Sequence, residues 1–412
     1  MVSAGPRQGA QSRLAGRRVL FVAEAVTLAH VARPLALSGA LENSGCELGF
    51  ACSPHYHWLL KDFGGSVHAL DSIDSARFLH SLARGRPVYD EATLNRYVAD
   101  DLDLLKRVRP DLVVGDFRLS LSISARLAQV PYLAISNAYW SPYVRQHYPL
   151  PEHPLARRLG LTFAQLLFSI ARPLVFARHT LPLNRVRRRH GLPPLGFKLN
   201  RVYTDADHVL YADVPEMFTM RGLPDNHHFL GPILWSPPVA KPDWWQRIPL
   251  DRPILYVTLG SSGQARLLPR VLDALAALPV TVLVAGSGQR LPDNLPGNVL
   301  AADYLPGMEA ATLAQLVICN GGSPTSHQAL AAGVPVLGLP SNLDQFLNMQ
   351  AVEASGAGVL LRADRADPAG IRRAAEHLLT TACYAEAAQR LAQTFAHYPA
   401  GPRFRQLVET LL

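Results

Sequence analysis

Residues 316–348 read LVICNGGSPTSHQALAAGVPVLGLPSNLDQFLN. The apolar run Leu316 to Cys319 predicts a buried strand. A glycine pair follows, and a helix is expected to begin at once, with Ser323 as its N-cap and Pro324 at its first helical position. Val336 to Leu339 predicts the next strand. This strand–turn–helix–strand order is typical of a parallel α/β sheet.

The same alternation of apolar strands and helical stretches occurs in both halves of the chain. Continuous apolar strands alternating with helices indicate a parallel sheet that is covered on both faces. The expected fold is therefore α/β, with two Rossmann-like doubly wound domains facing a central cleft, where ligands bind beyond the carboxyl ends of the strands. The strands that carry this prediction are Val19–Ala23, Leu48–Cys52, Leu112–Gly115, Tyr132–Ile135, Val209–Tyr211, Ile254–Leu259 and Thr281–Ala285.

Composition shifts divide the chain into five parts. A proline-rich stretch reads as a stiff linker between the two domains. The last helical material is expected to pack back on the N-terminal domain. The predicted parts are a tail at 1–16, a first domain at 17–232, the linker at 233–252, a second domain at 253–385 and a C-terminal helical segment at 386–412.

Charge and composition narrow the classes of function. Of the 412 residues, 49% are hydrophobic and 17% are charged, which excludes a disordered chain. The longest apolar stretch, Leu159 to Ala177, is interrupted by Arg172 and Pro173, so no membrane span is expected. The four cysteines show neither metal-ligand nor disulfide spacing, and we expect a cytoplasmic protein.

The net charge of +8 is concentrated in one region. Residues 145–201 contain eleven Lys or Arg and a single acidic residue, Glu152. This pattern fits either an ordinary solvated face or peripheral contact of residues 157–201 with the inner face of an anionic membrane. No nucleic-acid-binding module accompanies the charge, so nucleic acid is not expected as a partner.

The start of the helix after the glycine pair suits a phosphate group. Gly321 and Gly322 let the backbone approach a ligand closely, and the first N–H groups of a helix carry partial positive charge. Thr325 adds a hydroxyl in the first turn. Asp344 and Gln345, which are expected at the end of the next strand, carry the donors and acceptors that bind sugar hydroxyls. A plain strand–turn–helix unit remains the alternative interpretation.

The whole run resembles the nucleotide-sugar signature of the UDP-glycosyltransferase superfamily, known as glycosyltransferase family 1, whose fold is called GT-B. That signature is roughly His-Gly-Gly-x-Gly-Thr, Glu-Ala-Leu, Gly-Val-Pro and Asp-Gln-x-x-Asn. The resemblance implies a donor site that needs no cofactor and no metal. It places Asn320, Ser323 and Thr325 at the diphosphate, Asp344 and Gln345 at the sugar, Gly260 and Ser261 in a phosphate-contacting loop, and Tyr304 and Leu305 at the nucleobase.

Three residues depart from the family pattern. Asn320 replaces the histidine, Pro324 replaces the second glycine, and Gln328 replaces the glutamate that grips the ribose. A glutamine at this place is similar to that of bacterial rhamnosyltransferases that use dTDP-sugars. The donor is therefore expected to be either a UDP-linked or a dTDP-linked sugar.

Sugar transfer needs a base for the acceptor hydroxyl. His30 follows the first strand, and Asp116 ends the strand that begins at Leu112, so both belong to the edge that faces the cleft. The family base is the histidine of a Gly-His-x-x-Pro motif; here Ala29 replaces the glycine and Pro34 comes one residue late. By this resemblance Asp116 orients His30. The alternatives are that His30 has only a structural role and that Asp116 is the N-cap of the helix that follows it.

These observations lead to one main hypothesis and two rivals. The sequence indicates an inverting glycosyltransferase that acts on a small apolar, aromatic or lipid acceptor, with Asn137, Tyr139 and Trp140 expected at the acceptor. The first rival is a nucleotide-sugar epimerase on the same fold. The second is a non-catalytic nucleotide-sugar-binding subunit, which the three departures keep open.

Overall fold

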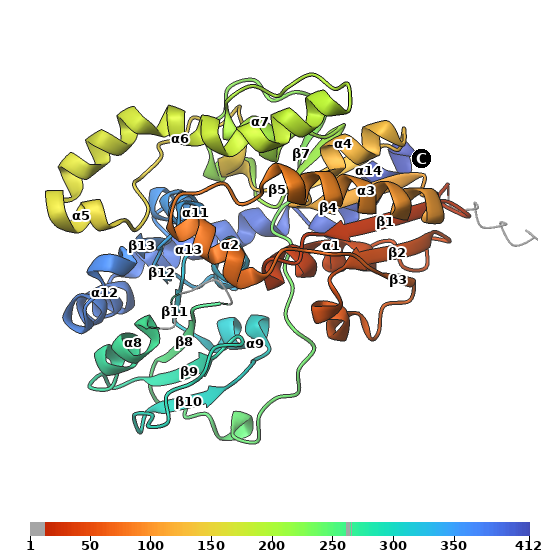
Figure 1. Ribbon diagram of the computed structural model, residues 1–412. Helices are drawn as coiled ribbons and strands as arrows, with labels where there is room; N and C mark the ends of the chain where they lie inside the picture. Colours follow the sequence, from red (N-terminus) through yellow and green to blue (C-terminus); the bar gives the residue numbers. More distant parts are fainter. Residues whose placement is uncertain (1–12, 261–263, 265) are drawn as a thin grey trace, which may run out of the picture.

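The computed structural model describes residues 13–260, 264 and 266–412 and contains two parallel sheets (Figure 1). The sheet of the first half has seven strands in the order β3-β2-β1-β4-β5-β6-β7, and that of the second has six in the order β10-β9-β8-β11-β12-β13. All strand pairs within the two sheets are parallel. The architecture is the expected GT-B arrangement of two doubly wound domains.

The N-terminal domain is built from short buried strands and longer covering helices. Its strands are β1 Arg18–Ala23, β2 Glu47–Cys52, β3 Ser66–Ala69, β4 Leu112–Asp116, β5 Tyr132–Ser136, β6 His208–Tyr211 and β7 His227–Phe229. Its helices are α1 Leu28–Gly39, α2 Ser75–Ala83, α3 Glu91–Val108, α4 Leu121–Leu127, α5 Pro154–Leu159, α6 Leu161–Arg189 and α7 Leu199–Tyr203.

The C-terminal domain repeats the pattern. Its strands are β8 Ile254–Thr258, β9 Thr281–Ala285, β10 Val299–Ala302, β11 Leu316–Cys319, β12 Val336–Gly338 and β13 Gly358–Leu360. Its helices are α8 Leu267–Leu275, α9 Gly307–Leu313, α10 Ser323–Ala331, α11 Leu343–Ala354, α12 Pro368–Thr380 and α13 Ala382–Ala396, and the chain ends with α14 Ala400–Leu411.

Alternate residues of the central strands pack on opposite helical layers. In β1, Phe21 packs with α1 and α14, whereas Leu20 packs with α3 and α4. In β8, Tyr256 packs with α9, α10 and α13, whereas Val257 packs with α8 and α12. Period-two alternation in strands that are buried on both faces produces this double layering. Because the helices cover the faces of the sheets, the carboxyl ends of β1, β4 and β11 remain available for functional residues.

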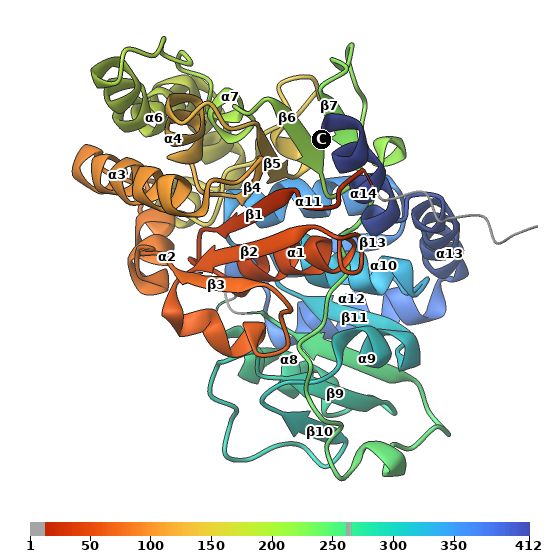
Figure 2. The ribbon, with the colours of Figure 1, turned by 90° about the vertical axis from the view of Figure 1, so that its right-hand side faces the viewer.

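The last two helices belong to different domains. The helix α13 packs on α10 of the C-terminal domain. The chain then crosses over, and α14 packs on α1, with Phe404 and Val408 in the core of the N-terminal domain (Figure 2). Arg403 Nε donates to the carbonyl oxygen of Phe229 at 3.0 Å. The crossing ties the two domains together a second time, besides the linker.

Two details of the quoted segment differ from expectation. The N-cap of α10 is Gly322, not Ser323, because Gly322 is already extended (φ −71°, ψ 146°) and Ser323 begins the helix. Asp344 and Gln345 lie in the first turn of α11, not at the end of a strand. Asn342 caps α11 through a reciprocal capping box with Gln345, which starts the helix directly after the β12 loop.

The irregular region is mostly one long helix. Neither Pro173 nor Pro182 ends α6, which runs for 29 residues. By length and composition alone, α6 is the one helix in the described part of the chain with an 18-residue apolar window long enough to cross a membrane. That window is only 6% buried, unlike the core helix of a globular domain. Arg172 and Pro173 were expected to interrupt the apolar stretch. For the helix this was wrong, because α6 continues through both residues.

A glycine at the crossing point offers a test of this packing. Gly231 has φ +95°, and a Cβ there would lie 2.0 Å from the carbonyl oxygen of Tyr398. We expect Gly231→Ala to destabilise the protein by about 3 kcal/mol or more, since positive φ and overlap add. Gly222→Ala is the matched control, with φ +56° and open space around it. Equal thermal unfolding midpoints for the two variants would contradict the packing of the crossing.

Candidate active site

His30 and Asp116 meet at the carboxyl edge of the N-terminal sheet. His30 lies in the first turn of α1, and Asp116 is the last residue of β4, the neighbour of β1 in the sheet. The Nδ1 atom of His30 lies 2.8 Å from Oδ1 of Asp116 and 3.3 Å from Nη2 of Arg33. The Asp116 side chain is fully buried, whereas that of His30 is 18% exposed. A carboxylate on Nδ1 holds the proton there and leaves Nε2 able to accept one, as a general base requires.

Arg33, which sequence reasoning missed, completes this pair. Its Nε donates to Oδ2 of Asp116 at 2.8 Å and its Nη2 to Oδ1 at 2.7 Å. The buried carboxylate thus has a bidentate cationic partner as well as the imidazole. The available signal was spacing, since Arg33 follows His30 by three residues and shares its helix face.

Behind Arg33, a polar chain runs to the other domain. The remaining Arg33 nitrogen, Nη1, donates to Oδ1 of Asn137 at 2.7 Å. Asn137 Nδ2 in turn donates to Oδ2 of Asp213 at 3.1 Å, and the backbone N–H of Ala138 donates to the same oxygen at 2.7 Å. Oδ1 of Asp213 lies 3.4 Å from Nε2 of His327 in α10. The chain of contacts therefore connects the His30 pair with the helix predicted to hold the donor.

Burial sets the charge state of the last two members. Burial raises the pKa of Asp213 to about 6, against the opposing effects of the Ala138 and Asn137 hydrogen bonds. Burial and, to a lesser extent, the positive charge of Arg33 together lower the pKa of His327 to about 3. Because its pKa is lowered, His327 is neutral at pH 7. Its contact with Asp213 is therefore not a full ion pair at neutral pH.

A second buried cluster holds the strand ends in place. Arg118 Nη1 pairs with Oε2 of Glu24 at 2.9 Å, and Arg118 Nε donates to Oδ1 of Asp101 at 3.0 Å. The guanidinium lies over the ring of Tyr97 at 3.6 Å. The backbone N–H of Glu24 donates to the carbonyl oxygen of Asp116 at 3.0 Å. The cluster thus fixes the loop after β1 against the end of β4, where the catalytic candidates lie.

The glycine turn before α10 has little space to spare. Gly321 has φ +81°, and a Cβ there would lie 2.6 Å from Cγ of Met349. Oδ1 of Asn320 accepts from the N–H of Gly322 at 3.0 Å, so its amide supports the turn. Asn348 is buried and donates to the carbonyl oxygen of Gly321 and to Oγ of Ser326, both at 2.8 Å. These contacts fix the turn directly before Ser323, the first residue of α10.

Other residues that were predicted to bind the donor sugar nucleotide make contacts within the protein. The Gln328 amide donates to the carbonyl oxygen of Trp235 and to Oγ of Ser236, both in the linker, the latter at 3.3 Å. Gln345 Oε1 accepts from the N–H of Ser341 at 3.0 Å. Tyr304 is half-buried beside Trp58, Leu305 is buried in the core, and Gly260 has φ +63°. Ser261 lies outside the described residues.

The predicted acceptor residues lie where the two domains meet. The indole N–H of Trp140 donates to Oδ1 of Asp344 at 2.8 Å, which joins an acceptor candidate to a donor candidate. Asn137 is occupied by Arg33 and Asp213, and Tyr139 is completely buried. Trp140 hydrogen-bonds a donor candidate and Tyr139 packs in the same cluster as Leu347 of α11, and a role of all three residues in acceptor binding stays a prediction.

The described residues contain no group of three or more His, Cys, Asp or Glu that could hold a metal ion. The site contains a histidine paired with a buried carboxylate at the edge of one sheet and the start of α10 after a strand of the other. A base and an electropositive helix start on opposite walls suit attack by a hydroxyl on a phosphate-activated carbon. Fold and site together define a GT-B glycosyltransferase.

The comparisons with known proteins agree. The family described as "Erythromycin biosynthesis protein CIII-like, C-terminal domain" matches residues 269–411. A "PGL/p-HBAD biosynthesis glycosyltransferase" of Mycobacterium tuberculosis (strain ATCC 25177 / H37Ra) is 51% identical over 96% of this chain and 92% of its own. A "PGL/p-HBAD biosynthesis rhamnosyltransferase" of Mycobacterium bovis (strain BCG / Pasteur 1173P2) is 52% identical over 96% and 88%.

Solved structures show the same fold. The spinosyn rhamnosyltransferase SpnG, solved in complex with thymidine diphosphate, superposes with a TM-score of 0.67 at 22% identity over 96% of this chain and 99% of its own. This chain belongs to the glycosyltransferase family of its mycobacterial relatives, within the UDP-glycosyltransferase superfamily. The glycosyltransferase hypothesis is thus confirmed, and the epimerase and the non-catalytic subunit are not favoured.

The Arg33–Asp116 pair predicts a non-additive pattern of stability. Removing one partner of a buried ion pair leaves the other uncompensated, so Arg33→Met should destabilise the protein by about 3–5 kcal/mol. In the double variant Arg33→Met/Asp116→Asn the uncompensated carboxylate is gone, and at least half of that loss should be recovered. Thermal unfolding of the intact chain measures both, and additive losses would contradict the pairing.

Asp213 predicts a pH dependence of stability. Its folded pKa of about 6 lies above the ordinary value of 3.8, so its contribution is most favourable below pH 3.8 and is lost as the pH rises through 6. We expect Asp213→Asn to be at least as stable as the wild type near pH 7.5, with the advantage shrinking towards about pH 5. The control is Asp225→Asn, at an exposed aspartate. A constant loss at both pH values would contradict this account.

Proposed function

We propose that this glycosyltransferase moves a sugar from a nucleoside-diphosphate sugar to a hydroxyl group of a small apolar, aromatic or lipid acceptor, with inversion at the anomeric carbon. The observation that carries the proposal is the His30–Asp116 pair at 2.8 Å, set across the domain boundary from α10. In this scheme Nε2 of His30 takes the proton of the acceptor hydroxyl as its oxygen attacks, and Asp116 stabilises the imidazolium that forms.

The leaving group is handled by the other domain. The first turn of α10 presents N–H groups and the hydroxyls of Ser323 and Thr325 to the departing diphosphate. Charge stabilisation from a helix start acts without a metal or another cofactor, and we propose that none is required. Asp344, whose Oδ1 is held by Trp140, keeps Oδ2 as a second carboxylate oxygen for a hydroxyl of the sugar.

For the donor we favour a rhamnosyl group carried on dTDP or UDP. One of the relatives is named as a rhamnosyltransferase, and its sequence is 52% identical to this one. Gln328 stands where the family has a glutamate, and it is buried and donates to the linker. A neutral glutamine at this position supports the rhamnosyl donor, because it is similar to that of rhamnosyltransferases that use dTDP-sugars. The names of the relatives also favour an acceptor in PGL/p-HBAD biosynthesis.

For location, we propose a cytoplasmic protein that touches the inner membrane face through residues 157–201. The support is the excess of basic residues in this stretch and its position on the outside of the N-terminal domain (Figure 1).

A substitution at His30 tests the proposed base. General-base catalysis contributes about 10²–10⁴-fold, so His30→Ala should lower the rate of sugar transfer at least about 100-fold. Donor binding should change little, since the donor contacts are in the other domain. His68→Ala is the control, because His68 lies on the edge strand β3, away from the site. Transfer is measured with a panel of nucleotide-sugars, and donor affinity by calorimetry. Full activity in His30→Ala would refute the assignment.

A further inference from the structure

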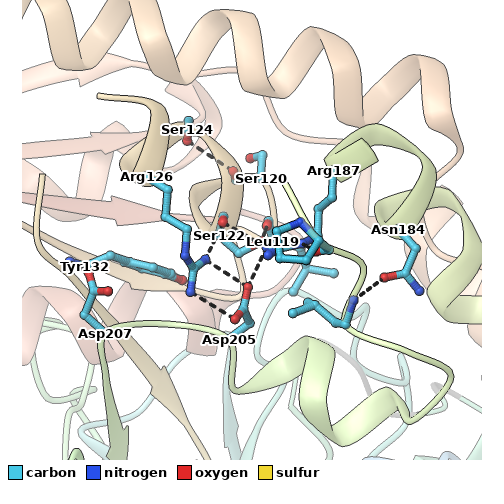
Figure 3. A network of polar contacts seen from close by, with 12 residues as sticks. Leu119, Ser120, Ser122, Ser124, Arg126, Tyr132, Asn184, Arg187, Asp205 and Asp207 are labelled. Carbon is cyan, nitrogen blue, oxygen red and sulfur yellow. Dashed lines mark hydrogen bonds and ion pairs between the residues drawn. The ribbon is translucent and has the colours of Figure 1, made fainter. Parts of the chain in front are cut away.

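The helix α6 has two halves with different surroundings. In its C-terminal half, Leu183, Val186 and Arg187 are buried. Arg187 Nη1 donates to Oδ2 of Asp205 at 2.7 Å, and Arg126 pairs with the same carboxylate at 2.9 and 3.0 Å (Figure 3). This network fixes the C-terminal half of α6 to the N-terminal domain, so the helix cannot cross a bilayer without losing these contacts.

The N-terminal half of α6 instead exposes a row of large apolar side chains. The spacing of its members is i, i+3, i+4, i+7 and i+11, which places them on one face of a helix. We call this row the α6 apolar face. Its members and their exposed fractions are Phe163 (52%), Leu166 (56%), Leu167 (38%), Ile170 (70%) and Leu174 (77%).

The arginine that interrupts the apolar sequence lies on the other side of the helix. The guanidinium of Arg172 lies 4.8 Å from the centre of the Tyr148 ring, and Phe176 meets the same ring edge-on at 5.2 Å. Arg172 follows Ile170 by two residues, or roughly 200° around the helix. The α6 apolar face is therefore continuous, although the sequence is not.

The surroundings of the α6 apolar face are cationic. Arg158 and Arg178 are exposed beside it, one in α5 and the other one turn beyond Leu174. The single acidic residue in residues 145–201, Glu152, pairs with Arg266 of the C-terminal domain. An exposed apolar face flanked by arginines fits the interface of an anionic bilayer, where apolar groups enter the headgroup boundary and cations meet lipid phosphates.

We infer that the α6 apolar face docks on an anionic membrane surface, with the helix lying in the interface and not spanning it. A second copy of the chain is a poorer occupant, because a two-fold contact would bring the same arginines together. The inference deepens the proposed function and rests on it only for the identity of the acceptor.

The side of α6 that lies opposite the apolar face packs towards the acceptor side of the site. Phe176, in the middle of α6, packs against the apolar cluster that contains Trp140 and Leu347. Trp140 in turn contacts Asp344. A membrane surface at the α6 apolar face would therefore lie one helix away from Trp140, close enough to supply a lipid-borne acceptor to the site. The class of acceptor that this geometry favours is a polar or aromatic headgroup on a membrane-anchored apolar chain.

Flotation of the full-length protein with vesicles tests the inference. One vesicle set contains phosphatidylglycerol and phosphatidylcholine, and the other contains phosphatidylcholine alone. The wild type should float with the anionic set, and less so at high salt, because salt screens the arginine contribution. Ile170→Glu/Leu174→Glu should lower the bound fraction at equal lipid by about tenfold or more, since two exposed apolar anchors become anionic.

Leu250→Glu is the matched control, because Leu250 is 76% exposed but lies in the linker, and it should bind as the wild type does. Unchanged thermal midpoints would show that all variants fold, and the milder Ile170→Ser/Leu174→Ser should bind to an intermediate extent. Equal binding by the glutamate double variant, or no binding by the wild type, would overturn the inference. The inference would also be overturned if the wild type formed a dimer that is lost in the glutamate double variant, while neither protein bound vesicles.

The failure of this inference and that of the proposed function are distinguishable. In vesicle-free buffer the glutamate double variant should transfer sugar to a water-soluble acceptor at the wild-type rate. Vesicle binding that survives in His30→Ala, together with full transfer activity, would refute the base and leave the docking surface in place. Wild-type transfer without vesicle binding would refute the docking surface alone.

Discussion

The carboxylate of Asp116 is the group around which the N-terminal half of the site is organised. It is fully buried at the end of a central strand, where an isolated charge would be very costly. Arg33 compensates the charge with two hydrogen bonds, and His30 adds a third. Because both partners come from α1, the position of that helix on β1 and β4 is tied to the geometry of the base. The carboxylate that holds α1 in place is thus the one that we propose orients the base.

The C-terminal half is organised by a close backbone approach. The Gly321 turn leaves no room for a side chain beside Met349, and Asn348 donates a hydrogen bond to the carbonyl oxygen of Gly321. The helix start that results is the place where we propose that the diphosphate binds. Trp140 and Asp344 join the two halves directly. In the proposed mechanism the N-terminal domain supplies the base, and the C-terminal domain supplies the helix start that stabilises the charge of the leaving group.

Much of this could be predicted from the sequence, because strand order and the carboxyl-edge rule depend on local patterns. The quoted segment placed α10 to within one residue, and His30 and Asp116 were expected at one edge before their contact was known. Side-chain partners are different, since they depend on packing between distant segments. Arg33 was missed although its spacing from His30 was visible. The internal contacts of Gln328 and Asn137, and the outward face of α6, required the folded chain.

The central claim is a single displacement in which His30 deprotonates the acceptor on one wall while α10 receives the diphosphate on the other. The configuration of the new glycosidic bond tests it most directly. Transfer from a donor of known anomeric configuration, followed by proton NMR of the product, measures that configuration. The account predicts inversion relative to the donor. A product with retained configuration would contradict it, because retention requires a different reaction path from the one that this pair of walls can support.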